Sequence, residues 1–455
     1  MSPKIPLPDP FASIPRHNIL YPFLFSPIHP LPTLTSSLNK VREATKTSSS
    51  SSSSSNASGK SHSPTQVSLY AKREDHSSAL ACAGNKYRKL EYIVPDILSA
   101  QPRFGAGVGG ELPTIPSSVK SDSRTRGKQI TTLVTEGALQ SNHTVQVTAV
   151  AGKLGLESVV LLHKGTGGGL RNSSDPEAFQ RTGNVQIVKL LGSDVRILDP
   201  PDPASGKTQD DIVEEVLEGL RAQGKNPYWI PSGASLHPLG GLGYARCAFE
   251  IAWQEEEMIG NLSSSSSIVD FHQPGSSGRF DYIFVACGSG STLGGLIAGF
   301  KLLDKIQPRL GKQHRRPRQI IGILTSPSQP KPYHEERILR FARQAGSLIG
   351  LDPETDITMA DVRLDDRFVG TGYGVLDTET KKALEVAAEL EEVILDPVYT
   401  AKVVRGIMAW VSEGKIERDA AVHDEGYEGE QRPGHVNALF IHTGGQFALG
   451  AYADV

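Results

Sequence analysis

Two clusters in the sequence combine residue types that could do covalent chemistry or bind a phosphate. The first is Gly84-Asn85-Lys86, which opens a run of Tyr, Arg, Lys, Leu and Glu residues with helical spacing. A lysine at the start of a helix lies where the helix dipole disfavours its positive charge. That position helps to keep the amine nucleophilic, as covalent catalysis by lysine requires. A solvated helix with Lys/Arg/Glu pairs is the alternative, and it suits Arg88 and Lys89 better than Lys86.

The second cluster is the turn Cys287-Gly288-Ser289-Gly290-Ser291-Thr292, which follows an apolar run. Its backbone N–H groups, its hydroxyls and the positive end of the helix that follows could together bind a phosphate. The spacing is not that of a Walker loop, because no lysine directly follows Gly290. No acidic residue stands where a dinucleotide ribose would need one. Taken alone, the motif could equally be an ordinary strand-to-helix turn.

The elements that must position these clusters alternate between strand and helix, as in parallel α/β proteins. The predicted strands are 129–134, 158–162, 194–198, 228–231, 282–286, 319–324 and 438–442. The predicted helices are 141–155, 179–191, 211–222, the second half of 237–256, 291–303, 335–348, 380–390 and 399–411. This order predicts two doubly wound, mainly parallel open-sheet lobes with a cleft between them. Right-handed crossovers should place helices on both faces of each sheet.

Four glycine- or hydroxyl-rich turns follow predicted strands. They lie at 135–142, 232–233, 288–292 and 443–446. In a parallel sheet such turns share the edge formed by the carboxyl ends of the strands, and ligands bind at that edge. The sequence therefore predicts that the ligand site is built from these turns.

Composition narrows the class of protein. The 455 residues are 38% hydrophobic and 21% charged, with a formal net charge of −3, which is typical of an ordinary folded protein. This charge balance does not call for nucleic acid or an anionic membrane as a partner. Three cysteines make neither a disulfide framework nor a metal-ligand spacing, so no metal is expected. Residues 1–25 are interrupted by prolines and no stretch reaches a membrane span, so we expect a cytoplasmic protein.

Four stretches are expected to be flexible insertions that decorate the fold. They lie near 46–64, 101–127, 262–278 and 417–434, and are rich in serine, in glycine and proline, or in acidic residues without periodicity. We assign residues 1–89 and 236–455 to a large cofactor-binding domain, and residues 90–235 to a small domain.

Six stretches of the chain, taken in order, resemble one enzyme family. They are YAKRED…GNKYRKLEY, LQSNHTVQVTAVAGKLG, SLHPLGGLGYARCAFEI, GSGSTLGG, LDPVYTAKVVRG and FIHTGGQFALGAYAD. Together they are similar to the 1-aminocyclopropane-1-carboxylate (ACC) deaminase and D-cysteine desulfhydrase family of fold type II pyridoxal-phosphate enzymes. The resemblance runs from about Ser26 to the C-terminus. It implies pyridoxal 5'-phosphate in the cleft, a small amino acid as substrate, and a homodimer.

The resemblance also implies roles for individual residues. Lys86 matches the lysine that holds the cofactor as a Schiff base, and Ser141, Tyr373 and Tyr399 match active-site residues. Cofactor contacts are implied for Lys89, Asn142, Gly288, Ser289, Gly290, Ser291, Thr292, Thr400 and Thr443. Each has a plainer alternative: Ser141 could cap the next helix, and Tyr399 could fill a sheet–helix interface.

Two departures from the family pattern bear on the substrate. Thr400 stands where ACC deaminases have a glutamate at the pyridine nitrogen, and Thr443 stands where they have leucine. A carboxylate would keep that nitrogen protonated, whereas a hydroxyl leaves it closer to neutral. We therefore favour D-cysteine desulfhydrase activity, which yields pyruvate, sulfide and ammonia, over ACC deamination to 2-oxobutanoate and ammonia. A cofactor-binding protein without turnover, or another fold type II activity, are the further alternatives.

Overall fold

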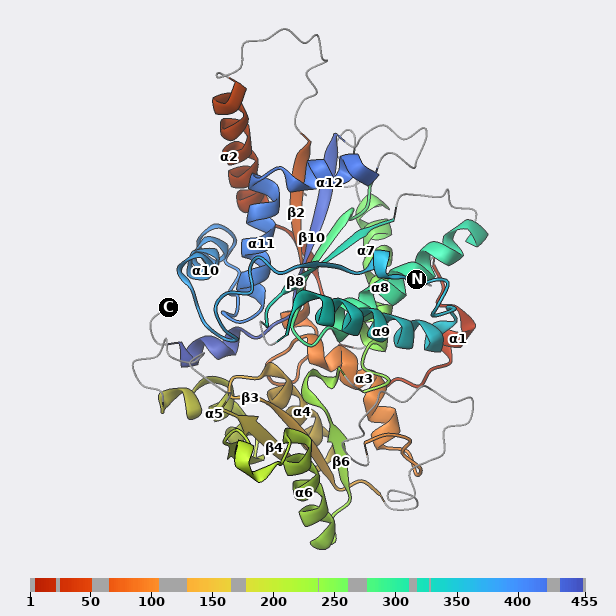
Figure 1. The fold of residues 1–455 in the computed structure, drawn as a ribbon. Helices are drawn as coiled ribbons and strands as arrows, with labels where there is room; N and C mark the ends of the chain where they lie inside the picture. The colour runs from red at the N-terminus through yellow and green to blue at the C-terminus, as the bar shows by residue number, and fades with distance from the viewer. Residues whose placement is uncertain are drawn as a thin grey trace.

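The computed structural model describes residues 5–21, 25–50, 65–105, 129–164, 177–235, 237–260, 276–310, 317–326, 329–423 and 434–452. Among these residues the chain forms two sheets, one above the other in Figure 1. The predicted insertion at 101–127 lies largely outside the described residues, as do most of those at 46–64 and 262–278.

The larger sheet has six strands in the order β1-β2-β10-β7-β8-β9. Their bounds are β1 Ile28–Pro30, β2 Gln66–Arg73, β7 Tyr282–Cys287, β8 Gln319–Leu324, β9 Arg363–Asp365 and β10 His435–His442. Only β1 pairs antiparallel with its neighbour, and the other pairings are parallel. The carboxyl ends of the parallel strands therefore share one edge of this sheet.

The smaller sheet has four strands in the order β5-β4-β3-β6, and all its pairings are parallel. Their bounds are β3 Thr132–Ala138, β4 Glu157–His163, β5 Asp194–Leu198 and β6 Pro227–Ile230. Helix α6 (Gln209–Ala222) packs on one face through Val213, Leu217 and Leu220, and α4 (Asn142–Leu154) and α5 (Gly183–Leu190) lie on the other. The two doubly wound, mainly parallel lobes predicted from the sequence are confirmed.

Twelve α-helices lie among the described residues and cover the sheets. They are α1 Asp9–Ala12, α2 Pro32–Ser50, α3 Asn85–Ile97, α4 Asn142–Leu154, α5 Gly183–Leu190, α6 Gln209–Ala222, α7 Leu242–Gly260, α8 Ser291–Ile306, α9 Lys331–Ile349, α10 Thr378–Glu391, α11 Thr400–Ser412 and α12 Lys415–His423.

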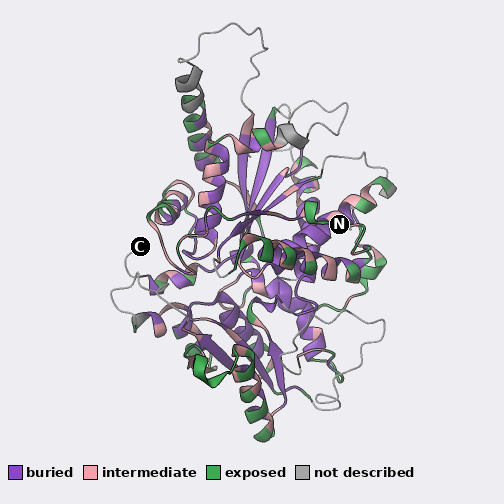
Figure 2. Ribbon diagram, in the orientation of Figure 1, coloured by how far each residue is buried: buried purple, intermediate pink, exposed green. Residues whose placement is uncertain are grey.

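Strand β7 shows why helices cover both faces of the larger sheet. Successive side chains of a strand point to opposite faces. Ile283 and Val285 join the core under α7, α8 and α9, while Tyr282 and Phe284 join the core under α2, α10 and α11. A strand buried on both sides is mostly apolar, and Figure 2 shows the central strands of this sheet as largely buried.

Two of the predicted insertions begin inside helices. The predicted insertion at 417–434 begins inside α12, which is anchored by the buried side chain of Ile416 and by an ion pair between Arg363 and Asp419. The predicted insertion at 46–64 begins in the last turn of α2, which runs to Ser50. Extending an existing helix by a turn costs little, even through serine.

Strand β3 is displaced from its predicted bounds of 129–134 to Thr132–Ala138. It pairs with β4 over its whole length, from Thr132 opposite Glu157 to Ala138 opposite His163. Residues 135–138 of the ligand turn predicted at 135–142 therefore belong to the strand.

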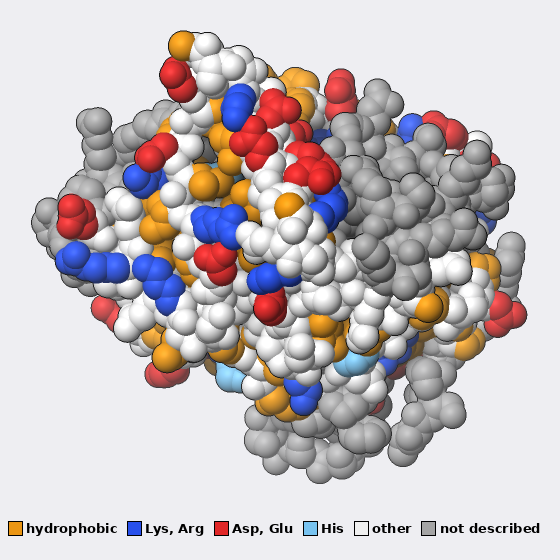
Figure 3. Space-filling view, turned by 90° about the horizontal axis from the view of Figure 1, so that it is seen from below, with side chains coloured by type: hydrophobic (Ala, Val, Ile, Leu, Met, Phe, Trp, Pro, Cys, Tyr) orange, Lys and Arg blue, Asp and Glu red, His pale blue; other side chains and the backbone are white. Residues whose placement is uncertain are grey.

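The surface around the smaller sheet carries mixed charge. In Figure 3 basic and acidic side chains are interspersed on the face seen from below. On α6, for example, Arg221 pairs with Glu218 at 2.6 Å. Within the described part of the chain, no helix is both long and apolar enough to cross a membrane.

Candidate active site

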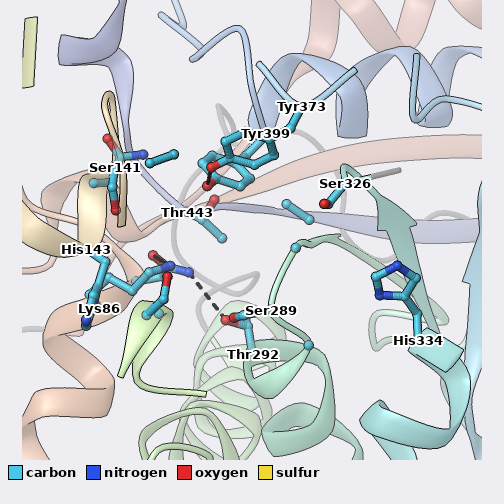
Figure 4. Close-up of a pocket in the computed structure, with 18 of the residues that line it drawn as sticks. Lys86, Ser141, His143, Ser289, Thr292, Ser326, His334, Tyr373, Tyr399 and Thr443 are labelled. Atoms are coloured by element: carbon cyan, nitrogen blue, oxygen red, sulfur yellow. Dashed lines mark hydrogen bonds between the residues drawn. The ribbon is translucent and has the colours of Figure 1, made fainter. Parts of the chain in front are cut away.

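A cavity of about 300 Å³ lies where the carboxyl edges of the two sheets face each other. All four predicted ligand turns contribute to its wall. The lining residues are Asn85, Lys86, Ala138, Ser141, Asn142, His143, Ser232, Gly233, Ala286, Gly288, Ser289, Gly290, Thr292, Ser326, His334, Arg337, Tyr373, Tyr399 and Thr443. Most of these side chains are drawn in Figure 4. The structure thus brings together residues from widely separated parts of the chain.

Lys86 is the second residue of α3, and its side chain projects into this cavity (Figure 4). Its Nζ donates a hydrogen bond to Asn85 Oδ1 at 2.9 Å. Burial lowers the pKa of Lys86 to about 8, although the Asp396 carboxylate opposes the shift. Because the amine is partly neutral near pH 7, it can act as a nucleophile or as a proton acceptor.

The start of α3 is held by α4 and by the end of β10. The backbone N–H groups of Lys86 and Tyr87 donate to Gln146 Oε1 of α4, at 3.0 and 3.1 Å. The N–H of Asn85 donates to the carbonyl of Thr443 at 3.1 Å. Gly84 comes so close to this strand end that a Cβ would lie 2.8 Å from the Thr443 oxygen. Lys86 is therefore positioned jointly by α4 and by the end of β10.

The turn at 287–292 has the geometry of an anion cradle. Gly290 adopts φ +96° at the N-terminus of α8, where only glycine is free of strain. Ser289 and Thr292 line the cavity. Ser291 and Lys89 lie just behind it, with Lys89 Nζ donating to Ser291 Oγ at 2.8 Å and to the Gly233 carbonyl at 2.9 Å. Burial and the neighbouring Lys86 hold the pKa of Lys89 well below its usual value.

Ser141 and Asn142 begin α4 on the opposite wall of the cavity. Ser141 occupies the N-cap position, yet its hydroxyl makes no capping hydrogen bond. The plainer interpretation of Ser141 as a helix cap therefore does not account for its side chain. Asn142 is oriented by Asn184, whose Nδ2 donates to Asn142 Oδ1 at 2.7 Å.

Two tyrosines lie together at the top of the cavity in Figure 4. The hydroxyls of Tyr373 and Tyr399 are hydrogen-bonded to each other, and the ring centroids are 6.1 Å apart. Burial raises the pKa of Tyr373 to about 12, and burial together with the neighbouring Tyr373 holds the pKa of Tyr399 well above its usual value. Both phenols therefore stay protonated at neutral pH and can donate hydrogen bonds.

Asp396 organises the turn that carries Tyr399 and Thr400. Its buried carboxylate accepts hydrogen bonds from the backbone N–H groups of Val398, Tyr399 and Thr400, at 3.0, 2.9 and 2.7 Å. The hydroxyl of Thr400 also donates to Asp396 Oδ1 at 2.7 Å. Thr400 is fully buried and does not line the cavity, whereas Thr443, at the end of β10, does.

The structure places three expected cofactor contacts, Lys89, Ser291 and Thr400, just outside the lining. It also adds lining residues that the sequence interpretation missed, including His143, Ser326, His334 and Arg337. His143 directly follows the Ser-Asn pair, and that position was the only sequence signal for it. The other three belong to no motif: Ser326 follows β8, and His334 and Arg337 lie in the first turns of α9, which meets the cavity only through folding.

His143 is almost fully buried, and its Nε2 lies 2.9 Å from Thr135 Oγ1. Its Nδ1 has no hydrogen-bond partner among the described residues. Burial, together with the nearby Lys86 and Lys89, holds the pKa of His143 well below its usual value. The cavity therefore contains a neutral imidazole with an unused nitrogen beside two lysines.

These features fit pyridoxal phosphate. Lys86 offers a partly neutral amine, the turn at 287–292 offers glycine-rich backbone at a helix N-terminus, and Lys89 lies behind that turn. Among the described residues no group of three or more His, Cys, Asp or Glu side chains could hold a metal ion. Lys86 suits an aldehyde, and the turn at 287–292 with Lys89 suits a phosphate, so these residues fit an organic cofactor that bears both groups.

Comparison with known proteins agrees with this geometry. A family model described as "Pyridoxal-phosphate dependent enzyme" matches residues 56–423. The probable 1-aminocyclopropane-1-carboxylate deaminase of Cryptococcus neoformans is 34% identical over 442 residues, covering 97% of this chain and 95% of that protein. The 1-aminocyclopropane-1-carboxylate deaminase of Burkholderia multivorans is 34% identical over 394 residues, covering 87% and 91%.

A solved structure described as an ACC deaminase homologue has the same fold. It superimposes with a TM-score of 0.63 at 24% sequence identity, and covers 98% of this chain and 96% of that one. The chain described here belongs to the pyridoxal-phosphate-dependent enzyme family, on the fold of its ACC deaminase homologues.

Proposed function

We propose that this protein is a pyridoxal-phosphate-dependent deaminase of a small amino acid, and that ACC is its substrate. The observation that carries the proposal is the match to ACC deaminases along 87–97% of the chain. The gathering of Lys86, Ser141, Tyr373 and Tyr399 in one cavity supports it. These comparisons favour ACC over D-cysteine, the substrate expected from Thr400 and Thr443.

The bound cofactor supplies an electron-withdrawing ring that stabilises negative charge on the substrate. Lys86 would hold the cofactor and, once its amine is displaced by the substrate amine, accept or deliver a proton. Its pKa of about 8 suits both directions of proton transfer near neutral pH. Asn85 would restrain that amine, because its Oδ1 accepts a hydrogen bond from Nζ. The Asp396 carboxylate would favour the charged form of the amine.

Ser141 and the two tyrosines would contact the substrate from opposite sides of the cavity. The Ser141 hydroxyl is free of the helix cap and can orient a carboxylate or a departing atom. Tyr373 and Tyr399 share one hydrogen bond, so one phenol proton stays available for donation into the cavity. Such fixed donors stabilise charge that develops during the reaction.

D-cysteine remains a second candidate because of Thr400 and Thr443. No carboxylate side chain lies among the cavity's lining residues, since Asp396 is turned to its own backbone turn and to Thr400. Without a carboxylate at the pyridine nitrogen, the ring withdraws electrons less strongly. Elimination of a β-thiolate tolerates a weaker electron sink better than cyclopropane opening does.

Product analysis of the cofactor-loaded enzyme with ACC and D-cysteine in parallel tests the proposal. We expect water-dependent formation of 2-oxobutanoate and ammonia from ACC. If only D-cysteine is turned over, to pyruvate and sulfide, then D-cysteine and not ACC is the substrate. No product from either, despite a change in cofactor absorbance, would indicate a binding protein without turnover.

We also propose that the enzyme acts as a cytoplasmic homodimer, as the family resemblance implies. Sedimentation of the holoenzyme tests the oligomeric state, and a monomer at micromolar concentration would contradict it.

A further inference from the structure

A basic pair on α9 has no role in the chemistry proposed above. His334 and Arg337 are three residues apart near the start of α9, so their side chains share one face of the helix. Both line the cavity, together with the turn at 287–292. In Figure 4 His334 lies to one side of Ser289 and Thr292, and Lys86 lies to the other.

The ring of His334 makes one hydrogen bond, to the backbone of Gln329, and the guanidinium of Arg337 has no ion-pair partner among the described residues. His334 is 3% exposed, and its Nε2 has no hydrogen-bond partner among the described residues. For Arg337 the described part of the chain provides no carboxylate within ion-pair distance, and the guanidinium only stacks on the ring of Phe341. The adjacent Glu335 pairs instead with Lys331 at 3.5 Å. A buried polar group is normally paired, so the Nε2 of His334 points to a ligand. Arg337 is partly exposed and provides an adjacent positive charge at the cavity wall.

Helix α9 packs directly against the turn at 287–292, which we call the phosphate turn. A Cβ on Gly290 would lie 3.3 Å from Cγ1 of Ile338 and 3.4 Å from Cδ2 of Phe341. Arg337 precedes Ile338 and therefore lies close to the turn. His334 is in the first turn of α9, one helical turn before Ile338. The N-terminus of α8, one guanidinium and one imidazole thus converge here.

We propose that His334 and Arg337 form an oxyanion subsite beside the phosphate turn, which binds a phosphate group from the α9 side. A guanidinium, an imidazole and helix N–H groups are the donors that a tetrahedral dianion prefers. The phosphate comes either from the cofactor itself or from a free oxyanion held next to it. The subsite does not depend on which amino acid the enzyme deaminates, so it can fail while the proposed function stands.

The test uses holoenzyme in phosphate-free buffer, with Arg337→Gln, His334→Gln and the control Arg340→Gln. Arg340 is exposed on the same helix and does not line the cavity. Inorganic phosphate is titrated into each protein by calorimetry. Cofactor retention on dilution and the phosphorus resonance of the bound cofactor are measured in parallel.

If the ligand is a free oxyanion, inorganic phosphate should bind to the wild-type holoenzyme. Arg337→Gln should then weaken this binding about tenfold or more. If the ligand is the phosphate group of the cofactor, added inorganic phosphate should not bind to the holoenzyme. Arg337→Gln would then loosen the cofactor by a similar factor and shift its phosphorus resonance. In either case Arg337→Lys should recover part of the loss, because it restores the charge.

The subsite is rejected if Arg337→Gln and His334→Gln match Arg340→Gln in both arms. Because Arg337 is only partly buried, its replacement should not disturb folding, and near-ultraviolet circular dichroism checks this.

Discussion

At the scale of single residues, the cavity combines groups whose environments set their protonation. Burial brings the pKa of Lys86 to about 8, while it keeps Tyr373 and Tyr399 protonated. An ordinary lysine has a pKa near 10.4 and would be almost fully charged at pH 7. The shift therefore supplies a usable amine in the same cavity that keeps two phenols as donors.

The pKa of Lys86 makes the rate of cofactor capture depend on pH. The neutral fraction of the amine should rise from roughly a tenth at pH 7 to roughly nine-tenths at pH 9, and then level off. Stopped-flow absorbance of cofactor added to cofactor-free protein should show about a tenfold increase in rate with a plateau above pH 9. A rate that climbs about a hundredfold between these values, without a plateau, would mean that Lys86 titrates as an ordinary lysine.

Lys86→Ala should abolish this absorbance change at every pH. A suitable control is Lys402→Ala, because Lys402 is another buried lysine whose pKa burial lowers to about 8, yet it donates to the Val369 carbonyl outside the cavity.

At the scale of elements, helix α3 is fixed on both sides. Behind the cavity Arg88 pairs with Glu74 and, at 2.9 Å, with Glu250, while Lys72 pairs with Glu250 at 2.5 Å. Removing one partner of such a buried network costs about 3–5 kcal/mol. Burial alone would raise the pKa of Glu250, but Arg88 and Lys72 outweigh it and hold the pKa at about 2. The network ties β2, α3 and α7 together.

On the cavity side, Gln146 caps α3 from a neighbouring helix. Gln146→Ala should cost about 1 kcal/mol of unfolding free energy, as the loss of other helix caps does, and should also weaken cofactor binding because Lys86 loses its support. Thr208→Ala is the matched control. It removes the cap of α6, which lies on the smaller sheet and outside the cavity lining.

Denaturant unfolding and cofactor titration measure the two effects separately. We expect both variants to lose similar stability and only Gln146→Ala to lose cofactor affinity. Unchanged affinity in Gln146→Ala would show that the contact between Asn85 and Thr443 alone positions Lys86.

At the scale of the whole molecule, the cavity is shared between the two sheets. Ser141, Asn142 and Gly233 come from the side of the smaller sheet, and Gly288, Tyr399 and Thr443 come from the side of the larger one. The strands of the smaller sheet fall within residues 132–230. The division into domains at 1–89, 90–235 and 236–455 remains a prediction.

A ligand bound between two sheets should stabilise both. At a free cofactor concentration 100 times its dissociation constant, binding should add about 2.7 kcal/mol to the free energy of unfolding. Calorimetry should show one transition that moves to higher temperature with cofactor concentration. If only part of the unfolding heat moved, the cofactor would contact one sheet alone.

Much of the fold follows from local sequence, because its signals are local. The bounds of β5 and β8 match the predicted strands 194–198 and 319–324, since each is a short apolar or β-branched run between breakers. The bounds of β3 and the start of the insertion predicted at 46–64 were misplaced. Strand bounds depend on pairing with segments distant in sequence, and a helix can propagate through residues that would not form a helix alone.

By itself the sequence determined the fold class, the position of Lys86 at a helix start and the glycine-rich turn at a strand end. These depend on periodicity, backbone freedom and charge at helix ends, and all three are set by nearby residues. Only the tertiary structure decided which groups face the cavity. Thr400 is turned away to Asp396, while His143, His334 and Arg337 are brought in. The physical reason is that burial, hydrogen-bond partners and pKa depend on which elements pack together, and no local pattern encodes that packing.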